Sequence, residues 1–268
     1  MHAPSPQDRA APGRRSLSYA GFAAIVVVYL VILQGGGLLA QHLFDAGEEF
    51  VTTKDVFVGL WIPVGTALLF TYGMIAWLGW MRPVLHDDRP VQRWVYVVPI
   101  VFAVAIAIAI DYADLLDKDV GFILALLVAT QFVGWGEEGM FRGIGVTVLR
   151  DHALTEGRVA LISSLIFGSV HLTNIISRGT GAISQALIVS VAGYFFYLTR
   201  RVSGGNALNS VIHGLFDFSI ITGTAILVDQ EQYVGSIAAI LTYFVISIIL
   251  IVRRRKIELE PAAAGATS

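Results

Sequence analysis

The stretch GWGEEGMFRG, residues 134–143, places two glutamates and an arginine inside a run of otherwise apolar sequence. The chain has 268 residues, of which 56% are hydrophobic and 14% charged, and its mean hydropathy is +0.72. This composition lies far from that of a soluble domain. A charge at the bilayer centre costs from ~3 to more than 10 kcal/mol, so charged groups there usually face the bundle interior and serve function. The stretch therefore predicts a polytopic membrane protein with a polar site inside it.

Charge and cysteine content exclude several classes of function. The net charge of -2 provides no basic excess for a phosphate backbone, so we expect no nucleic-acid partner. The chain has no cysteine, which excludes a thiol nucleophile, a disulfide, a Cys-ligated zinc and an iron-sulfur cluster. Any chemistry must use histidine, carboxylates, hydroxyls or a metal.

Outward from the stretch, hydropathy predicts an all-α bundle of about eight transmembrane helices. A helix that crosses the hydrocarbon needs about 20 apolar residues. The candidate spans are residues 19–43, 56–80, 93–110, 121–149, 159–176, 182–199, 205–227 and 234–252. No internal repeat and no inverted pair of broken spans is visible, which disfavours a transporter fold.

Basic residues orient these spans, because Lys and Arg concentrate in cytoplasmic loops. With the N-terminus inside, the inner segments hold 14 of the 18 basic residues, whereas the outer segments hold three and are rich in acidic residues. We therefore expect both termini in the cytoplasm of a multi-pass protein of the inner or plasma membrane. Residues 1–18 are predicted to be a disordered cytoplasmic tail, 19–252 the helical domain, and 253–268 a basic and then flexible tail. A cleaved signal peptide is the alternative for the N-terminal region, although its apolar run is longer than that of a typical signal.

Six charged or imidazole side chains fall in the interior of the predicted spans, away from the span ends. A structural role as interhelical glue is the alternative for each of them alone. At about 1.5 Å per residue, three of them lie roughly 18 to 20 Å from the inner boundary on three different helices, namely Glu137, His171 and His213. The full set is Glu137, Glu138, Arg142, His171, His213 and Asp217.

Spacing within each helix indicates which of these side chains share a face, because residues four apart are neighbours. Glu138 and Arg142 have the spacing of an ion pair, which makes Glu138 structural. Glu137 projects about 100° away, in apolar surroundings that suit a general base. His213 and Asp217 have the spacing of an imidazole oriented by a carboxylate. Glycines and serines around these positions predict close helix packing.

In combination, these residues resemble the CPBP family, which comprises membrane-embedded type II CAAX prenyl proteases and bacterial relatives in bacteriocin processing and immunity. The matching motifs are EExxxR at Glu137, Glu138 and Arg142, FxxxH at Phe167 and His171, and HxxxN/D at His213 and Asp217. The resemblance covers roughly residues 120–225. It implies an intramembrane endopeptidase that acts on a membrane-bound or lipid-modified polypeptide.

The resemblance also implies roles for the matched residues. Glu137 would activate a water, His171 would assist or bind the activated species, and His213 with Asp217 would complete the site. Family members more often have Asn at the last position, and an ionised Asp217 cannot donate a hydrogen bond to an oxyanion. Asp217 would therefore either be protonated or orient His213. The metalloprotease label of the family leaves open a Zn²⁺ ion held by His171, His213 and Glu137, and a metal-free mechanism is the other reading.

Two other functions stay open at this stage. The fold could serve as a non-catalytic scaffold or bacteriocin-immunity protein, or as a proton-coupled transporter. Other protease chemistries lack their signatures, because the sequence contains no HExxH zinc motif and no GxSxG nucleophile elbow. It also has no intramembrane aspartate pair with a GxGD motif.

Overall fold

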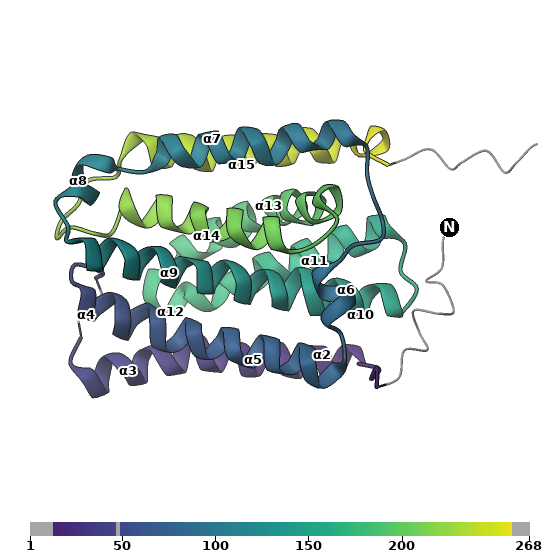
Figure 1. Ribbon diagram of the computed structural model, residues 1–268, viewed down its shortest axis with the longest axis horizontal. Helices are drawn as coiled ribbons and strands as arrows, with labels where there is room; N and C mark the ends of the chain where they lie inside the picture. Colours follow the sequence, from purple (N-terminus) through teal and green to yellow (C-terminus); the bar gives the residue numbers. More distant parts are fainter. Residues whose placement is uncertain (1–12, 47–48, 259–268) are drawn as a thin grey trace, which may run out of the picture.

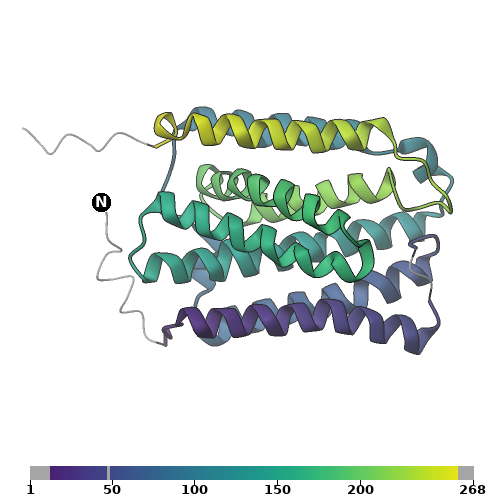
Figure 2. The same ribbon diagram turned by 180° about the vertical axis from the view of Figure 1, so that it is seen from behind.

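The computed structural model describes residues 13–46 and 49–258, and within these ranges it is an all-α bundle. Its long helices lie nearly side by side (Figures 1 and 2). The first half contains α2 (Tyr19–Leu30), η1 (Val31–Gly35), α3 (Gly36–Phe44), α4 (Thr53–Val56), η2 (Phe57–Trp61), α5 (Ile62–Leu78), α6 (Met81–Leu85), η3 (Arg93–Tyr96), α7 (Val97–Ala109) and α8 (Tyr112–Leu116). The second half contains α9 (Val120–Glu137), η4 (Glu138–Gly145), α10 (Val146–Asp151), α11 (Glu156–Val170), η5 (His171–Asn174), α12 (Ile175–Arg178), α13 (Gly181–Ser203), α14 (Ala207–Thr222), α15 (Val234–Val252) and η6 (Arg254–Lys256).

The helices form layers around a central group. α9 and α14 pack extensively against each other, as do α11 and α13. α5 covers α9 on one side, and the pair of α7 and α15 covers α13 and α14 on the other. Figure 1 shows α2, α3 and α5 at the bottom of the bundle and α7 with α15 at the top. The ionisable residues of the predicted site therefore lie on the central helices.

Each of the eight predicted spans coincides with helix, but the helices differ in length. Among the described residues, five continuous helical segments are long and apolar enough to cross a membrane: 19–44, 53–78, 120–151, 181–203 and 234–252. Residues 93–109 and 207–222 form shorter apolar helices, and α11 has 15 residues. At 1.5 Å per residue α11 is about 22 Å long, which is less than the ~30 Å of hydrocarbon. The predicted fifth span, 159–176, lies within a continuous helical run, although this run changes at His171 into the 3₁₀ turn η5 before α12 ends it at Arg178.

Parts of both predicted tails are packed against the bundle. Arg14 forms an ion pair of 2.8 Å with Asp151, and the carbonyl of Arg15 accepts a hydrogen bond from the indole of Trp80. At the other end of the chain, the side chain of Ile257 is buried. Residues within 13–18 and 253–258 therefore contact the bundle, and the predicted disorder of the tails stays a prediction. Residues 1–12 and 259–268 of the predicted tails lie outside the described residues.

Arginines that the sequence assigned to solvated loops form a buried ion network at one end of the bundle. The carboxylate of Asp87, between α6 and η3, pairs with Arg150 at 2.9 Å and with Arg200 at 2.8 Å. Arg150 also pairs with Glu156 at 2.8 Å. Arg200 is fully buried and donates a 2.7 Å hydrogen bond to the carbonyl of Arg142 in η4. The network ties the loop after α6 to the segment that carries the predicted site.

The pKa of Asp87 gives the network a pH dependence. Burial opposes ionisation of this carboxyl, but the guanidinium groups of Arg150 and Arg200 outweigh burial and lower its pKa below the ordinary value. A lowered folded-state pKa contributes stability above the unfolded pKa of about 3.9, and this stability is lost as pH falls through the folded value. We expect Asp87→Asn to unfold at a lower temperature than wild type at pH 7.

The temperature difference between Asp87→Asn and wild type should shrink as the pH is lowered below about 4. Thermal unfolding of both proteins in detergent between pH 7 and 3 measures this difference in unfolding temperature. A difference that stays constant over the whole range would show that ionisation of Asp87 does not stabilise the fold.

Candidate active site

The backbone of the opening stretch changes its helical form at the predicted site. α9 passes without interruption into η4, a π-helix over Glu138–Gly145, and the amide of Val146 bonds to the carbonyl of Phe141 five residues earlier. π-Turns inside α-helices occur frequently at functional sites. Every residue of η4 is buried. The change therefore places Glu138 and Arg142 inside the bundle, with Glu137 at the junction.

Glu138 is the centre of the polar contacts. Its Oε1 accepts a 3.0 Å hydrogen bond from Arg142 Nη1 and lies 2.9 Å from His213 Nδ1. Its other oxygen accepts a hydrogen bond from the amide of Asn209. Because a carboxylate can only accept, Nδ1 of His213 carries the proton in this pair. Glu138 thus fixes the orientation of the imidazole.

The predicted ion pair of Arg142 with Glu138 is confirmed. Both side chains are fully buried. The guanidinium lies 3.8 Å from the centre of the Phe167 ring, a cation–π contact, and Nη2 donates to the carbonyl of Gly193 at 3.2 Å. A buried charge without its partner is strongly destabilising. These contacts indicate that Arg142 holds Glu138 in place.

Glu137, His213 and Asp217 converge on one space. His213 Nε2 lies 3.6 Å from Glu137 Oε2 and 3.7 Å from Asp217 Oδ2, which is beyond direct hydrogen bonding. The side chains of Glu137 and Asp217 are 16% and 25% exposed, whereas that of Glu138 is 0% exposed. Groups at this separation can share one water. The sequence paired His213 with Asp217 as its orienting carboxylate, but the hydrogen-bonded carboxylate is Glu138, which another helix supplies.

His171 joins the group through Phe167. Its Nδ1 is 2.8 Å from the carbonyl of Phe167, and its ring meets the Phe167 ring edge to face at 5.1 Å. The ring of His213 contacts the same phenylalanine at 5.9 Å. One buried ring therefore separates and positions the two imidazoles. His171 is half-buried, and its hydrogen bond to Phe167 uses Nδ1 rather than Nε2.

A close crossing of α9 and α14 brings these side chains together. A Cβ atom on Gly134 would lie 2.3 Å from the carbonyl oxygen of Ser210 and 2.6 Å from the amide nitrogen of Gly214. Only glycine permits this approach of two backbones. The crossing lies one turn before Glu137 on α9 and beside His213 on α14. The predicted close packing by glycine is confirmed at this position.

We expect Gly134→Ala to lower both the stability and the activity of the protein. The added methyl group meets backbone atoms that cannot rotate away, and overpacking of this kind costs about 1–3 kcal/mol. Gly73→Ala on α5 is the matched control, because a Cβ there meets nothing within 4 Å. Thermal unfolding of both variants in detergent measures the effect. Equal unfolding temperatures for the two variants would show that the crossing is not tight.

Two site residues had no assigned role in the sequence. Asn209 lies one turn before His213 on α14 and is fully buried. The spacing of Asn209, His213 and Asp217 at intervals of four is the signal that could have identified it. Phe196 stacks on the His213 ring at 4.7 Å and 16°. No motif marks Phe196, since aromatic residues are frequent along α13.

The residues do not form a metal-binding set as they stand. Among the described residues, no three His, Asp or Glu side chains are grouped so that they could hold a metal ion. Nδ1 of His213 is bonded to Glu138, and Nδ1 of His171 faces the carbonyl of Phe167. Each imidazole therefore has only Nε2 left as a ligand atom. The Zn²⁺ ion considered from the sequence stays a prediction, because a metal-ligating histidine also binds through one ring nitrogen while the other donates to a carboxylate or a carbonyl.

Comparisons with known proteins identify the central helices. Residues 119–219 match the family described as Rce1-like, type II CAAX prenyl endopeptidase Rce1-like. No curated protein and no solved structure matched the chain. The matched segment begins at the N-cap of α9 and ends within α14, so it contains all six predicted site residues. Over these residues, which form the central helices of an all-α bundle, the chain is therefore similar to the type II CAAX prenyl endopeptidases.

Proposed function

We propose that the protein is an intramembrane endopeptidase that hydrolyses a peptide bond of a membrane-bound or lipid-modified polypeptide. One observation carries this proposal: a partly exposed carboxylate, Glu137, lies 3.6 Å from Nε2 of a buried histidine, His213. Glu138 holds that histidine from its other side. A base, an oriented imidazole and a shared space for water are the parts that hydrolysis requires.

In the proposed reaction, Glu137 removes a proton from water and the resulting hydroxide attacks the carbonyl carbon of the scissile bond. The tetrahedral intermediate then collapses, the C–N bond breaks, and Glu137 returns the proton to the leaving nitrogen. The products are a new carboxyl terminus and a new amino terminus. General acid–base catalysis by one positioned group contributes about 10²–10⁴-fold.

The two histidines have different proposed roles. Nε2 of His213 has two carboxylates as its nearest polar neighbours, which makes it a proton donor on that side. In this role it donates to the oxyanion of the intermediate. Nδ1 of His171 donates to the carbonyl of Phe167, so its Nε2 accepts a hydrogen bond from the attacking water. Asp217 stabilises the positive charge on His213.

Cells provide the test of the proposed function. The amino and carboxyl termini of the membrane proteome are compared between cells with the wild-type protein and cells with Glu137→Gln. New termini that depend on wild-type protein support proteolysis. Identical termini in both cell lines, together with an unchanged phenotype of the variant, would instead favour a scaffold or immunity role.

We propose that the reaction needs no metal, since no three His, Asp or Glu side chains of the described residues are grouped as a ligand set. We expect cleavage of a membrane peptide by purified protein to keep its rate after dialysis against a zinc chelator. Metal analysis of the dialysed sample confirms removal. A rate that falls on dialysis and returns when zinc is added would contradict the metal-free mechanism and support Zn²⁺ on His171, His213 and Glu137.

We also propose that the bundle crosses the inner or plasma membrane eight times. The end that contains α6 and α10 (Figure 1) faces the cytoplasm, because the arginines concentrate there. Because the chain has no cysteine, Arg158→Cys supplies a unique label at this end. A membrane-impermeant thiol reagent should label it only in inverted vesicles, and labelling in intact cells would reverse the proposed topology.

A further inference from the structure

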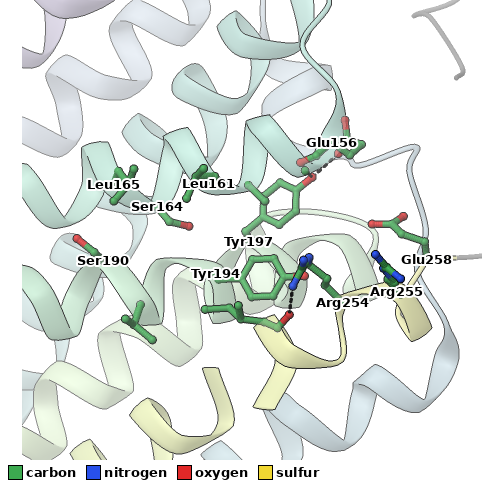
Figure 3. Close-up of a pocket in the computed structure, with 14 residues that line it drawn as sticks. Glu156, Leu161, Ser164, Leu165, Ser190, Tyr194, Tyr197, Arg254, Arg255 and Glu258 are labelled. Carbon is green, nitrogen blue, oxygen red and sulfur yellow. Dashed lines mark hydrogen bonds between the residues drawn. The ribbon is translucent and has the colours of Figure 1, made fainter. Parts of the chain in front are cut away.

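A cavity of about 750 Å³ lies apart from the catalytic residues, at the end of the bundle where the ion network is located. Its lining comes from α11, α13 and the segment that ends α15, and it includes none of the six predicted site residues. Figure 3 shows its side chains facing one another across the space. The volume is within the ~300–1,000 Å³ typical of small-molecule sites. The cavity is therefore a second candidate binding site.

The cavity has a long apolar wall. Ala160, Leu161 and Leu165 line it from α11, Val191 lines it from α13 and Ile251 from α15. From Gly157 to Leu165 the groove follows α11 for about 12 Å at 1.5 Å per residue. A neighbouring cavity of about 390 Å³ shares Leu165 and Ser190 with it and continues to Leu172. The groove therefore has the narrow, extended and apolar form that suits a hydrocarbon chain.

The mouth of the groove is basic. Arg254 and Arg255 line it, and both are exposed. Within the described part of the chain no carboxylate pairs with either guanidinium, and Arg254 only donates to the carbonyl of Ile251 at 3.2 Å. The two acidic residues of the mouth form ion pairs with arginines that do not line the groove. Glu258 pairs with Arg201 at 2.7 Å, and Glu156 pairs with Arg150 at 2.8 Å. Two positive charges are thus available to an anion.

We propose that this groove binds an anionic phospholipid, with the phosphate on Arg254 and Arg255 and an acyl chain along α11. The arginines follow closely after an apolar helix of 19 residues, which places them at the level of the headgroups. Basic pockets between transmembrane helices bind anionic headgroups. The apolar wall favours a phospholipid over free phosphate as the ligand.

Native mass spectrometry of the full chain, purified from nanodiscs that contain phosphatidylglycerol and phosphatidylcholine, tests the proposal. We expect wild type to retain phosphatidylglycerol preferentially. Arg254→Ala with Arg255→Ala should bind it roughly tenfold or more weakly. The matched control, Arg253→Ala with Lys256→Ala, removes the same charge from exposed residues outside the groove and should bind as wild type does.

A second variant tests the apolar part of the groove. Gly157 lines the groove and a Cβ there meets nothing within 4 Å, so Gly157→Phe is expected to fill part of the groove with the fold retained. It should reduce lipid retention although all four basic residues remain. The proposed site is overturned if Arg253→Ala with Lys256→Ala weakens lipid binding as much as Arg254→Ala with Arg255→Ala does. It is also overturned if Gly157→Phe retains as much lipid as wild type. If lipid retention rises only when the chain is cut after Glu258, the occupant of the groove is the protein's own tail. This result would also overturn the proposed lipid site.

Discussion

Replacing Glu137 by Gln is expected to lower the rate of peptide hydrolysis by roughly 10²–10⁴-fold, because the amide cannot take a proton from water. The side chain is partly exposed, and its polar neighbour at 3.6 Å is not hydrogen-bonded to it, so the fold should be unaffected. The measurement is the initial rate of cleavage of a membrane peptide by reconstituted protein.

Glu231→Gln is the control for the loss of a negative charge, since Glu231 is exposed and follows α14 at the end of the bundle that lies away from the ion network. Its rate should equal that of wild type. If Glu137→Gln also keeps the wild-type rate while its thermal unfolding is unchanged, Glu137 is not the general base.

Arg142→Ala is expected to destabilise the protein by about 3–5 kcal/mol, because it leaves the carboxylate of Glu138 buried and without its ion-pair partner. It also removes the contact with Phe167 at 3.8 Å and the hydrogen bond to Gly193. Arg142→Lys keeps the charge but loses the planar group that bridges these partners, so it should lie between alanine and wild type.

Reversible unfolding in mixed detergent measures these differences. Arg158→Ala is the matched control, because Arg158 is exposed near the start of α11. Exposed substitutions usually change stability by less than about 0.5 kcal/mol. A similar small change in Arg142→Ala would mean that the buried ion pair does not hold the site together.

Relations within one helix could be predicted from the sequence. The ion pair of Glu138 and Arg142 followed from their spacing, and it is present. Each of the eight stretches that hydropathy chose contains helix, and five continuous helical segments of the described residues are long and apolar enough to cross a membrane. The residue types of the site were also predictable, since ionisable groups are too costly in a membrane to occur there without a purpose.

Relations between helices could not be predicted from spacing. The partner of His213 is Glu138 on η4 rather than Asp217 on its own helix, and this depends on the crossing at Gly134 and Gly214. The π-form of η4 has no signature in the sequence that would distinguish it from continued α-helix. The sequence placed Arg200 among the basic residues of the inner segments. Nothing near it in sequence reveals that Asp87 would pair with it.

The central claim is that Glu137 activates a water for attack on a peptide carbonyl. It is tested most directly by cleavage in ¹⁸O-labelled water with wild type and Glu137→Gln side by side, followed by mass spectrometry of the products. We predict one ¹⁸O atom in the new carboxyl terminus of the wild-type product and no product above background with the variant. Labelled product formed equally fast by Glu137→Gln would contradict the claim.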